Sequence, residues 1–91
     1  MYVLSAKLTF NIPCAQSLKN KRQVSRSLVQ KVRQRYNVAV AEVDTQDSHQ
    51  TLSLGIAVVS GEYSNAQKLL DEVIRFMELH EEAEFRAVEM F

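Results

Sequence analysis

The 91-residue sequence has few of the residues that mark special architectures. A single cysteine, Cys14, rules out an internal disulfide, and nothing indicates an oxidising compartment. One proline, two glycines and a hydrophobic content of 46% exclude a collagen-like or disordered chain. No apolar run approaches the roughly 20 residues that a membrane helix needs. The first residues do not read as a secretion signal, so we expect one cytoplasmic domain spanning residues 1–91.

Acidic residues are absent from the first 41 positions, although the net charge of the chain is zero. All charged residues in this part are basic, whereas positions 42–91 hold all 11 acids and only three bases. The two parts therefore carry charges of +8 and −8. Such asymmetry indicates either a nucleic-acid-binding face beside an acidic face, or two halves that neutralise each other after folding.

Four segments have the polarity pattern of β-strands, and they cover residues 2–11, 38–44, 51–60 and 84–90. The third segment is small or apolar on both faces, so we expect it near the centre of a sheet. In the first segment one of the two alternating faces is more polar. We expect this face to stay uncovered, and its residues are Val3, Ser5, Lys7 and Thr9.

Two segments between the strands have apolar residues at helical spacing. Ser17 is the predicted N-cap of a helix that ends near Tyr36. Ser64 and Gln67 fit a capping box for a second helix that ends near Glu81. The order β-α-β-β-α-β predicts an α+β, ferredoxin-like fold. It is a two-layer sandwich in which both helices cover one face of a four-stranded antiparallel sheet.

The first helix has an almost uniformly cationic polar side. At 100° per residue, four cations fall within roughly 60° of one another on one flank of the apolar stripe, and Lys21 lies closer to the stripe itself. The first turn carries cations where the helix dipole favours acids, so a bound phosphate would compensate their charge. The sequence therefore predicts an RNA- or phosphate-binding site made of Lys19, Lys21, Arg22, Arg26 and Arg33.

The alternative is that the acidic half cancels these charges within the molecule. The second helix carries Glu78, Glu81 and Glu82 near its end. Because the two helices of this topology run antiparallel, these acids lie at the end of the molecule where the first helix begins. Lys21 is the cation best placed to pair with them, together with its neighbours Lys19 and Arg22.

No constellation for catalysis or metal binding is visible. His49 and His80 are the only histidines, and no spacing resembles a pair of metal ligands. Cys14 lies in a loop with no histidine near it in sequence, and no glycine-rich phosphate loop is present. We therefore predict a protein that is not an enzyme and has no catalytic residue, metal or cofactor.

The face of the sheet that we expect to be open has no aromatic ring on which RNA bases could stack. It is partly apolar, which favours burial against a partner, most simply a second copy of the chain. The apolar residues that we place on it are Val3, Ala57, Val59 and Val88. A homodimer through the sheet is therefore expected. The alternative to RNA binding is a dimeric protein-interaction or small-ligand regulatory domain whose charges pair internally.

Two segments, Ser17–Arg22 and Tyr36–Asp44, resemble the YlxP-like family of bacterial domains of unknown function. The resemblance covers nearly the whole chain and implies a ferredoxin-like fold. Family members are often encoded among translation and ribosome-maturation factors, which implies a link to ribosome assembly or RNA. The motif positions that carry over are Lys19, Lys21, Arg22, Glu42 and Asp44.

One departure from the family pattern lies after the central hairpin. Relatives often have a tryptophan there, whereas this chain has the polar segment Asp47–Gln50. Any partner contact made by that aromatic is weakened or different here. With the basic helix, the resemblance predicts a non-catalytic module that docks on structured, ribosomal RNA and does not bind a membrane.

Overall fold

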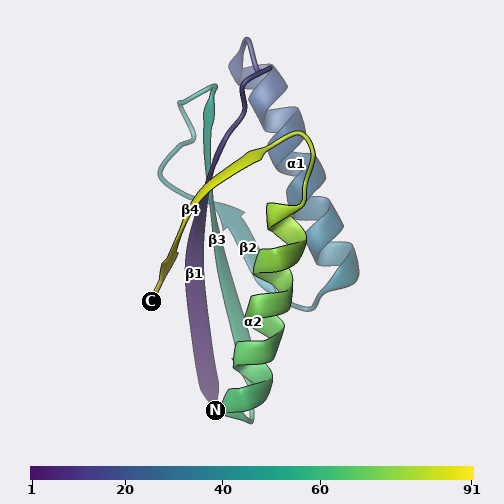
Figure 1. Ribbon diagram of the computed structural model, residues 1–91, viewed down its shortest axis with the longest axis vertical. Helices are drawn as coiled ribbons and strands as arrows, with labels where there is room; N and C mark the ends of the chain where they lie inside the picture. The colour runs from purple at the N-terminus through teal and green to yellow at the C-terminus, as the bar shows by residue number, and fades with distance from the viewer.

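The computed structural model describes residues 1–91 and has two layers, a sheet and a pair of helices (Figure 1). The sheet is antiparallel with the strand order β2-β3-β1-β4, and its strands are β1 (Tyr2–Asn11), β2 (Ala39–Glu42), β3 (Thr51–Ser60) and β4 (Glu84–Met90). Helices α1 (Leu18–Arg35) and α2 (Tyr63–Glu78) cover the same face of the sheet. The predicted fold class and order of elements are confirmed.

The core lies between the sheet and the helices because each element has one apolar face. In β1 the even-numbered residues Ala6, Leu8 and Phe10 are buried under the helices. The odd-numbered residues point to the uncovered side, and this agrees with the face predicted for β1. The central strand β3 adds its own buried residues, which are Leu52, Leu54, Ile56 and Val58.

The two helices begin in different ways. Ser17 caps α1 as predicted, because its Oγ accepts a hydrogen bond of 3.2 Å from the Asn20 N–H. The capping box predicted at Ser64 is wrong, since α2 begins at Tyr63 and no side chain caps it. The Tyr63 ring packs edge-on against Tyr2 of β1, with 5.7 Å between the ring centroids. This tertiary contact, directly after β3, leaves Ser64 inside the first turn.

An irregularity in the pairing of β4 with β1 changes which side chains share a face. Arg86 is an extra residue on β4, and after it Ala87 lies opposite Thr9 and Val88 lies opposite Leu8. Leu8 belongs to the helix-covered face, so Val88 does too. The prediction that Val88 lies on the open face is therefore wrong, because the extra residue reverses the alternation. Val88 stays exposed because β4 is an edge strand.

Candidate nucleic-acid interface

Four cations of α1 are exposed along one flank of the helix. We call this set the basic ridge, and its members are Lys19, Arg22, Arg26 and Arg33. No carboxylate oxygen lies within 4.0 Å of any of them. The ridge makes one internal hydrogen bond, in which the Arg33 guanidinium donates to the Val40 carbonyl of β2 at 3.1 Å. The ridge is therefore uncancelled by ion pairs and lies on the β2 side of α1.

The opposite flank of α1 faces α2. Arg35 lies there, with its guanidinium carbon 5.2 Å from the centroid of the Phe76 ring of α2. The Tyr36 ring at the end of α1 also packs edge-on against Phe76, with the centroids 5.6 Å apart. At 100° per residue this flank is roughly opposite to Arg26 and Arg33. The basic ridge therefore points away from α2 and from the acids that α2 carries.

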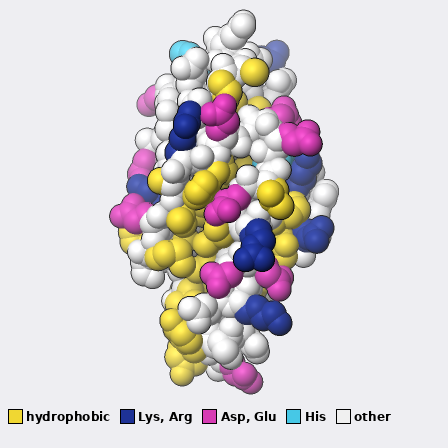
Figure 2. All heavy atoms as spheres, in the orientation of Figure 1, with side chains coloured by type: hydrophobic (Ala, Val, Ile, Leu, Met, Phe, Trp, Pro, Cys, Tyr) yellow, Lys and Arg dark blue, Asp and Glu magenta, His cyan; other side chains and the backbone are white.

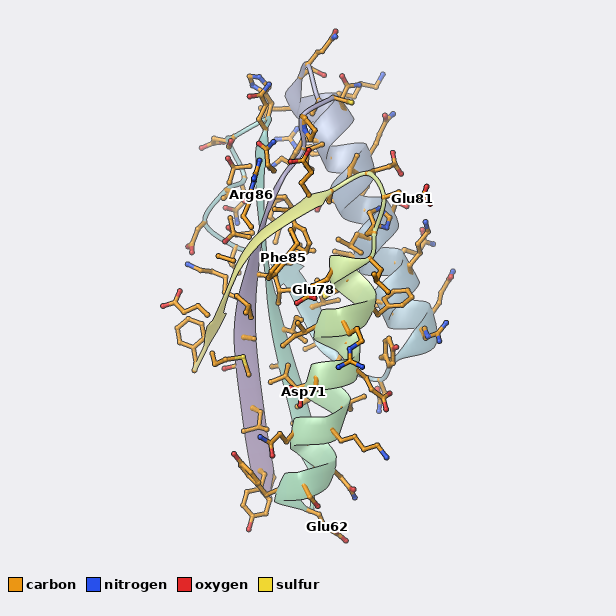
Figure 3. All side chains as sticks on the ribbon, viewed as in Figure 1. Glu62, Asp71, Glu78, Glu81, Phe85 and Arg86 are labelled. Carbon is orange, nitrogen blue, oxygen red and sulfur yellow. The ribbon has the colours of Figure 1, made fainter.

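The acids of α2 do not reach the basic ridge. Asp71 and Glu78 lie on the side of α2 that is turned away from α1 (Figure 3). Of the acids after α2, Glu82 has one of its carboxylate oxygens 3.9 Å from Nε2 of His80, and Glu81 makes no ion pair. The expected pairing of these acids with the start of α1 is wrong. Glu72 lines the same pocket as Arg35, on the flank of α1 away from the basic ridge, and makes no ion pair.

Lys21 is not part of the basic ridge. Its side chain is fully buried, and its ammonium forms an ion pair with the Glu42 carboxylate of β2. It also donates to the Thr45 carbonyl at 2.7 Å. The Thr45 hydroxyl donates to the same carboxylate at 3.0 Å and accepts from the Ser53 N–H at 2.9 Å. The prediction that Lys21 binds phosphate is wrong, because a buried ammonium needs internal partners and here it has them.

The second acid of the family motif, Asp44, also has a structural partner. Asp44, which follows β2 with a positive φ of 66°, accepts a hydrogen bond of 3.2 Å from Lys7 on β1. This hydrogen bond, with the negative charges of Asp44 and Glu89, raises the pKa of Lys7 above its ordinary value. Sequence reasoning missed the pairing of Lys21 with Glu42. A signal for it existed, because Lys21 occupies a position of the apolar stripe one turn before Ser25.

His80 is an unusual polar group just beyond α2. Its side chain is largely buried, and Nε2 makes no hydrogen bond. Burial and the positive charge of Lys31 lower the pKa of His80, against smaller opposing effects of Glu82 and Glu81. No three His, Cys, Asp or Glu side chains are grouped so that they could hold a metal ion. Neither α1 nor α2 combines the length and the apolar character that a membrane-spanning helix requires.

The open face of the sheet is apolar toward the N-terminal end of β1. Val3 and Val59 lie directly opposite each other there and are 55% and 63% exposed. Hydrophobic side chains gather at this end of the molecule in Figure 2. Farther along, a shallow groove of about 470 Å³ has Ala41, Gly55 and Ala57 among its lining residues. The predicted apolar character of the open face is therefore present, although Val88 is not part of it.

Comparison with known proteins agrees with this architecture. The family DUF503, described as a protein of unknown function, matches residues 3–90. The chain is 37% identical over 70 residues to the uncharacterized protein YlxP of Bacillus subtilis (strain 168), which covers 77% of this chain and 76% of that protein. A de novo designed protein with a ferredoxin fold, solved by NMR, matches 100% of this chain and 84% of its own with a TM-score of 0.57. At 14% identity that likeness shows the fold alone. The family resemblance read from the sequence is confirmed, and the chain belongs to the DUF503 family.

Proposed function

We propose that this protein is a non-catalytic module that docks on structured RNA, ribosomal RNA in particular, through the basic ridge of α1. The observation that carries the proposal is that the four ridge cations are exposed and have no carboxylate within 4.0 Å. In a chain of zero net charge, nothing requires such a row to stay unpaired. A polyanion that lies along α1 supplies the missing counter-charges.

The chemistry of the ridge favours phosphate over bases. Arg22, Arg26 and Arg33 end in planar guanidinium groups, which match the oxygens of a phosphate with two parallel hydrogen bonds. Contacts to phosphate fix the position of a protein on nucleic acid but carry little sequence information. The module is therefore expected to recognise the shape of a folded RNA rather than a base sequence.

The test is binding of a fluorescently labelled ribosomal RNA hairpin at several salt concentrations. Four phosphate contacts give a slope of about −3 in a plot of log affinity against log salt concentration. The variant R22E/R26E/R33E is expected to lose binding, because three attractions become repulsions. Unchanged affinity in this variant contradicts the proposal.

A matched control uses cations that lie outside the ridge. The variant K31E/K68E/R75E makes the same change in net charge with residues of α1 and α2 that make no ion pair. It is expected to keep most of its affinity for the hairpin. Equal losses in both variants indicate a response to net charge rather than docking on the ridge.

We propose as the second candidate that the open face binds another copy of the chain. Val3 and Val59 lie directly opposite each other on this face and are exposed. Two copies whose open faces pack on each other across a two-fold axis form a self-complementary interface. No charged side chain of β1 precedes Lys7, so this end of β1 meets the partner without side-chain repulsion. The exposed Val3 and Val59 are buried in this arrangement.

Size-exclusion chromatography with light scattering tests this second candidate. The wild type is expected to have the mass of a dimer and V59K that of a monomer, because lysine at the interface needs solvent. L79K is the control, since Leu79 is even more exposed than Val59 but follows α2 on the other layer. A monomeric wild type at high protein concentration contradicts the dimer.

A further inference from the structure

The shape of the basic ridge restricts the kind of RNA that fits it. Lys19, Arg22, Arg26 and Arg33 all belong to one uninterrupted helix of 18 residues. With a rise of 1.5 Å per residue, Arg22 and Arg33 are about 16 Å apart along the axis. The cations thus form a straight, rigid row instead of a set of flexible loop residues. A ligand with regularly spaced phosphates matches such a row better than a flexible one.

A shallow hollow of about 360 Å³ lies on this row. It is bordered by Arg26 and Arg33, and its other lining residues are Ser25, Val29 and Gln30. The two arginines are seven residues apart, which is two helical turns, so both point to the same side. The bond to the Val40 carbonyl holds Arg33 in place and leaves its other N–H groups free. This hollow offers two guanidinium groups to a single phosphate, with the Gln30 amide beside them.

No exposed aromatic ring accompanies the basic ridge. Tyr2 and Tyr63 pack against each other at the N-terminal end of β1, and Phe91 follows β4. Tyr36 lies on the flank of α1 that faces α2 and packs there against Phe76 of α2, and Arg35 covers both rings. Proteins that hold single-stranded RNA stack its bases on aromatic side chains. The ridge has no such platform, so it suits a nucleic acid whose bases are already stacked inside a double helix.

The packing of α1 on the sheet favours RNA over DNA as the ligand of the basic ridge. One stripe of α1 is packed on the sheet along most of its length, as the burial of Lys21, Ser25, Leu28 and Val32 shows. A helix that enters the major groove of B-DNA has to insert itself into a groove about 8.5 Å deep, and α1 exposes only its outer side. A-form RNA instead has a wide, shallow minor groove that displays 2′-hydroxyls between phosphates. The exposed flank of α1 fits this flatter surface.

We propose that the ligand of the basic ridge is double-helical RNA, contacted across its minor groove, with one backbone phosphate in the hollow between Arg26 and Arg33. This inference rests on the proposed function and makes it more specific. Gln30 lies between the two arginines and can hydrogen-bond a 2′-hydroxyl, the group that DNA lacks.

The experiment compares three labelled probes by fluorescence anisotropy in the same buffer. They are an RNA hairpin, a single-stranded RNA that cannot pair with itself, and a DNA hairpin of matching sequence. The RNA hairpin is expected to bind at least about tenfold tighter than either of the others. Binding of the single strand as tight as that of the hairpin overturns the duplex inference and the preference for folded RNA, and leaves only RNA docking through the basic ridge standing. Equal binding of the DNA hairpin overturns the choice of RNA. Absence of binding to all three probes overturns the proposed function itself.

Substitutions then test the hollow. R26Q is the sharper variant because Arg26 makes no internal hydrogen bond, whereas R33Q also loses the bond to β2. R26Q is expected to reduce the salt slope for the RNA hairpin by about one, which corresponds to one lost phosphate contact. R75Q on α2 is the control and is expected to leave the slope unchanged. An unchanged slope in R26Q overturns the placement of a phosphate in the hollow.

Discussion

At the scale of single residues, an ion pair gives Lys21 a structural role that the other cations of α1 do not share. Lys21 and its neighbours Lys19 and Arg22 look alike in sequence, yet the Lys21 side chain is fully buried against Glu42 and Thr45. A buried ion pair stabilises a protein little more than a well-packed apolar pair in the same place. Removing only one partner is strongly destabilising, because it leaves a buried charge without compensation. Lys21 therefore acts by joining α1 to the end of β2.

Replacing Lys21 by methionine tests this role. K21M is expected to lower the free energy of unfolding by about 3 kcal/mol, because Glu42 is left beside an apolar surface without its cation. The double variant K21M/E42L is expected to recover most of this loss, since neither charge remains. Urea denaturation measures both. K19M is the matched control and stays within about 0.5 kcal/mol of wild type, because Lys19 is exposed. If K21M is as stable as K19M, Lys21 does not have the proposed structural role of joining α1 to the end of β2.

The buried His80 is expected to make the stability of the protein depend on pH. Its pKa is lowered in the folded state by burial first and then by the charge of Lys31. The unfolded chain therefore takes up the proton more readily, so stability falls as pH drops below the ordinary value of 6.5 and levels off below the folded pKa. H80Q is expected to lose less stability than wild type over this window. Urea denaturation at a series of pH values measures the difference. Parallel profiles for the two proteins contradict the lowered pKa.

At the scale of elements, the two helices differ in what fixes their first residue. The start of α1 is local, because the Ser17 side chain accepts from the Asn20 N–H. The start of α2 depends on tertiary contact, because Tyr63 packs on Tyr2 and the Ser64 side chain caps nothing. The capping pattern therefore predicts the start of α1, where no tertiary contact competes with it, and fails at α2, where the contact between Tyr63 and Tyr2 does.

Two alanine substitutions test this difference. S17A is expected to lower the free energy of unfolding by about 1 kcal/mol, because one N–H of the first turn loses its acceptor. S64A is expected to change it by less than about 0.5 kcal/mol, because Ser64 is exposed and caps nothing. Thermal or urea unfolding checks both variants. A larger loss in S64A than in S17A contradicts the assignment of the caps.

At the scale of the whole molecule, the charge asymmetry of the sequence becomes a separation in space. The basic ridge lies on the β2 side of the helix layer, and Asp71 and Glu78 lie on the outer side of α2. The acids therefore do not cancel the ridge, although the net charge is zero. For the proposed docking, this separation means that the acidic side repels the polyanion that the ridge attracts, which orients the encounter.

This separation predicts that the ridge contributes little to folding. The free energy of unfolding of the variant R22E/R26E/R33E is expected to lie within about 1 kcal/mol of the wild-type value, because the three side chains are exposed and without ion pairs. The upper end of this range is expected, because R33E loses the bond to β2 and puts a glutamate in the last turn of α1, where the helix dipole disfavours it. Urea denaturation at low salt checks the value. A loss above about 3 kcal/mol marks the ridge as structural, and the loss of RNA binding in this variant then has no bearing on docking.

The sequence by itself determined the order of elements, the fold class, the Ser17 cap and the amphipathic character of α1. These features depend on local periodicity and on groups a few residues apart, which one chain displays directly. Only the tertiary structure decided that Lys21 faces Glu42, that Val88 changes face after the extra residue Arg86, and that Asp71 and Glu78 of α2 lie away from α1. The physical reason is that a helical wheel fixes angles within one helix but not the rotation of that helix against its neighbours. The packing of apolar stripes on the sheet sets that rotation, and with it which charges meet.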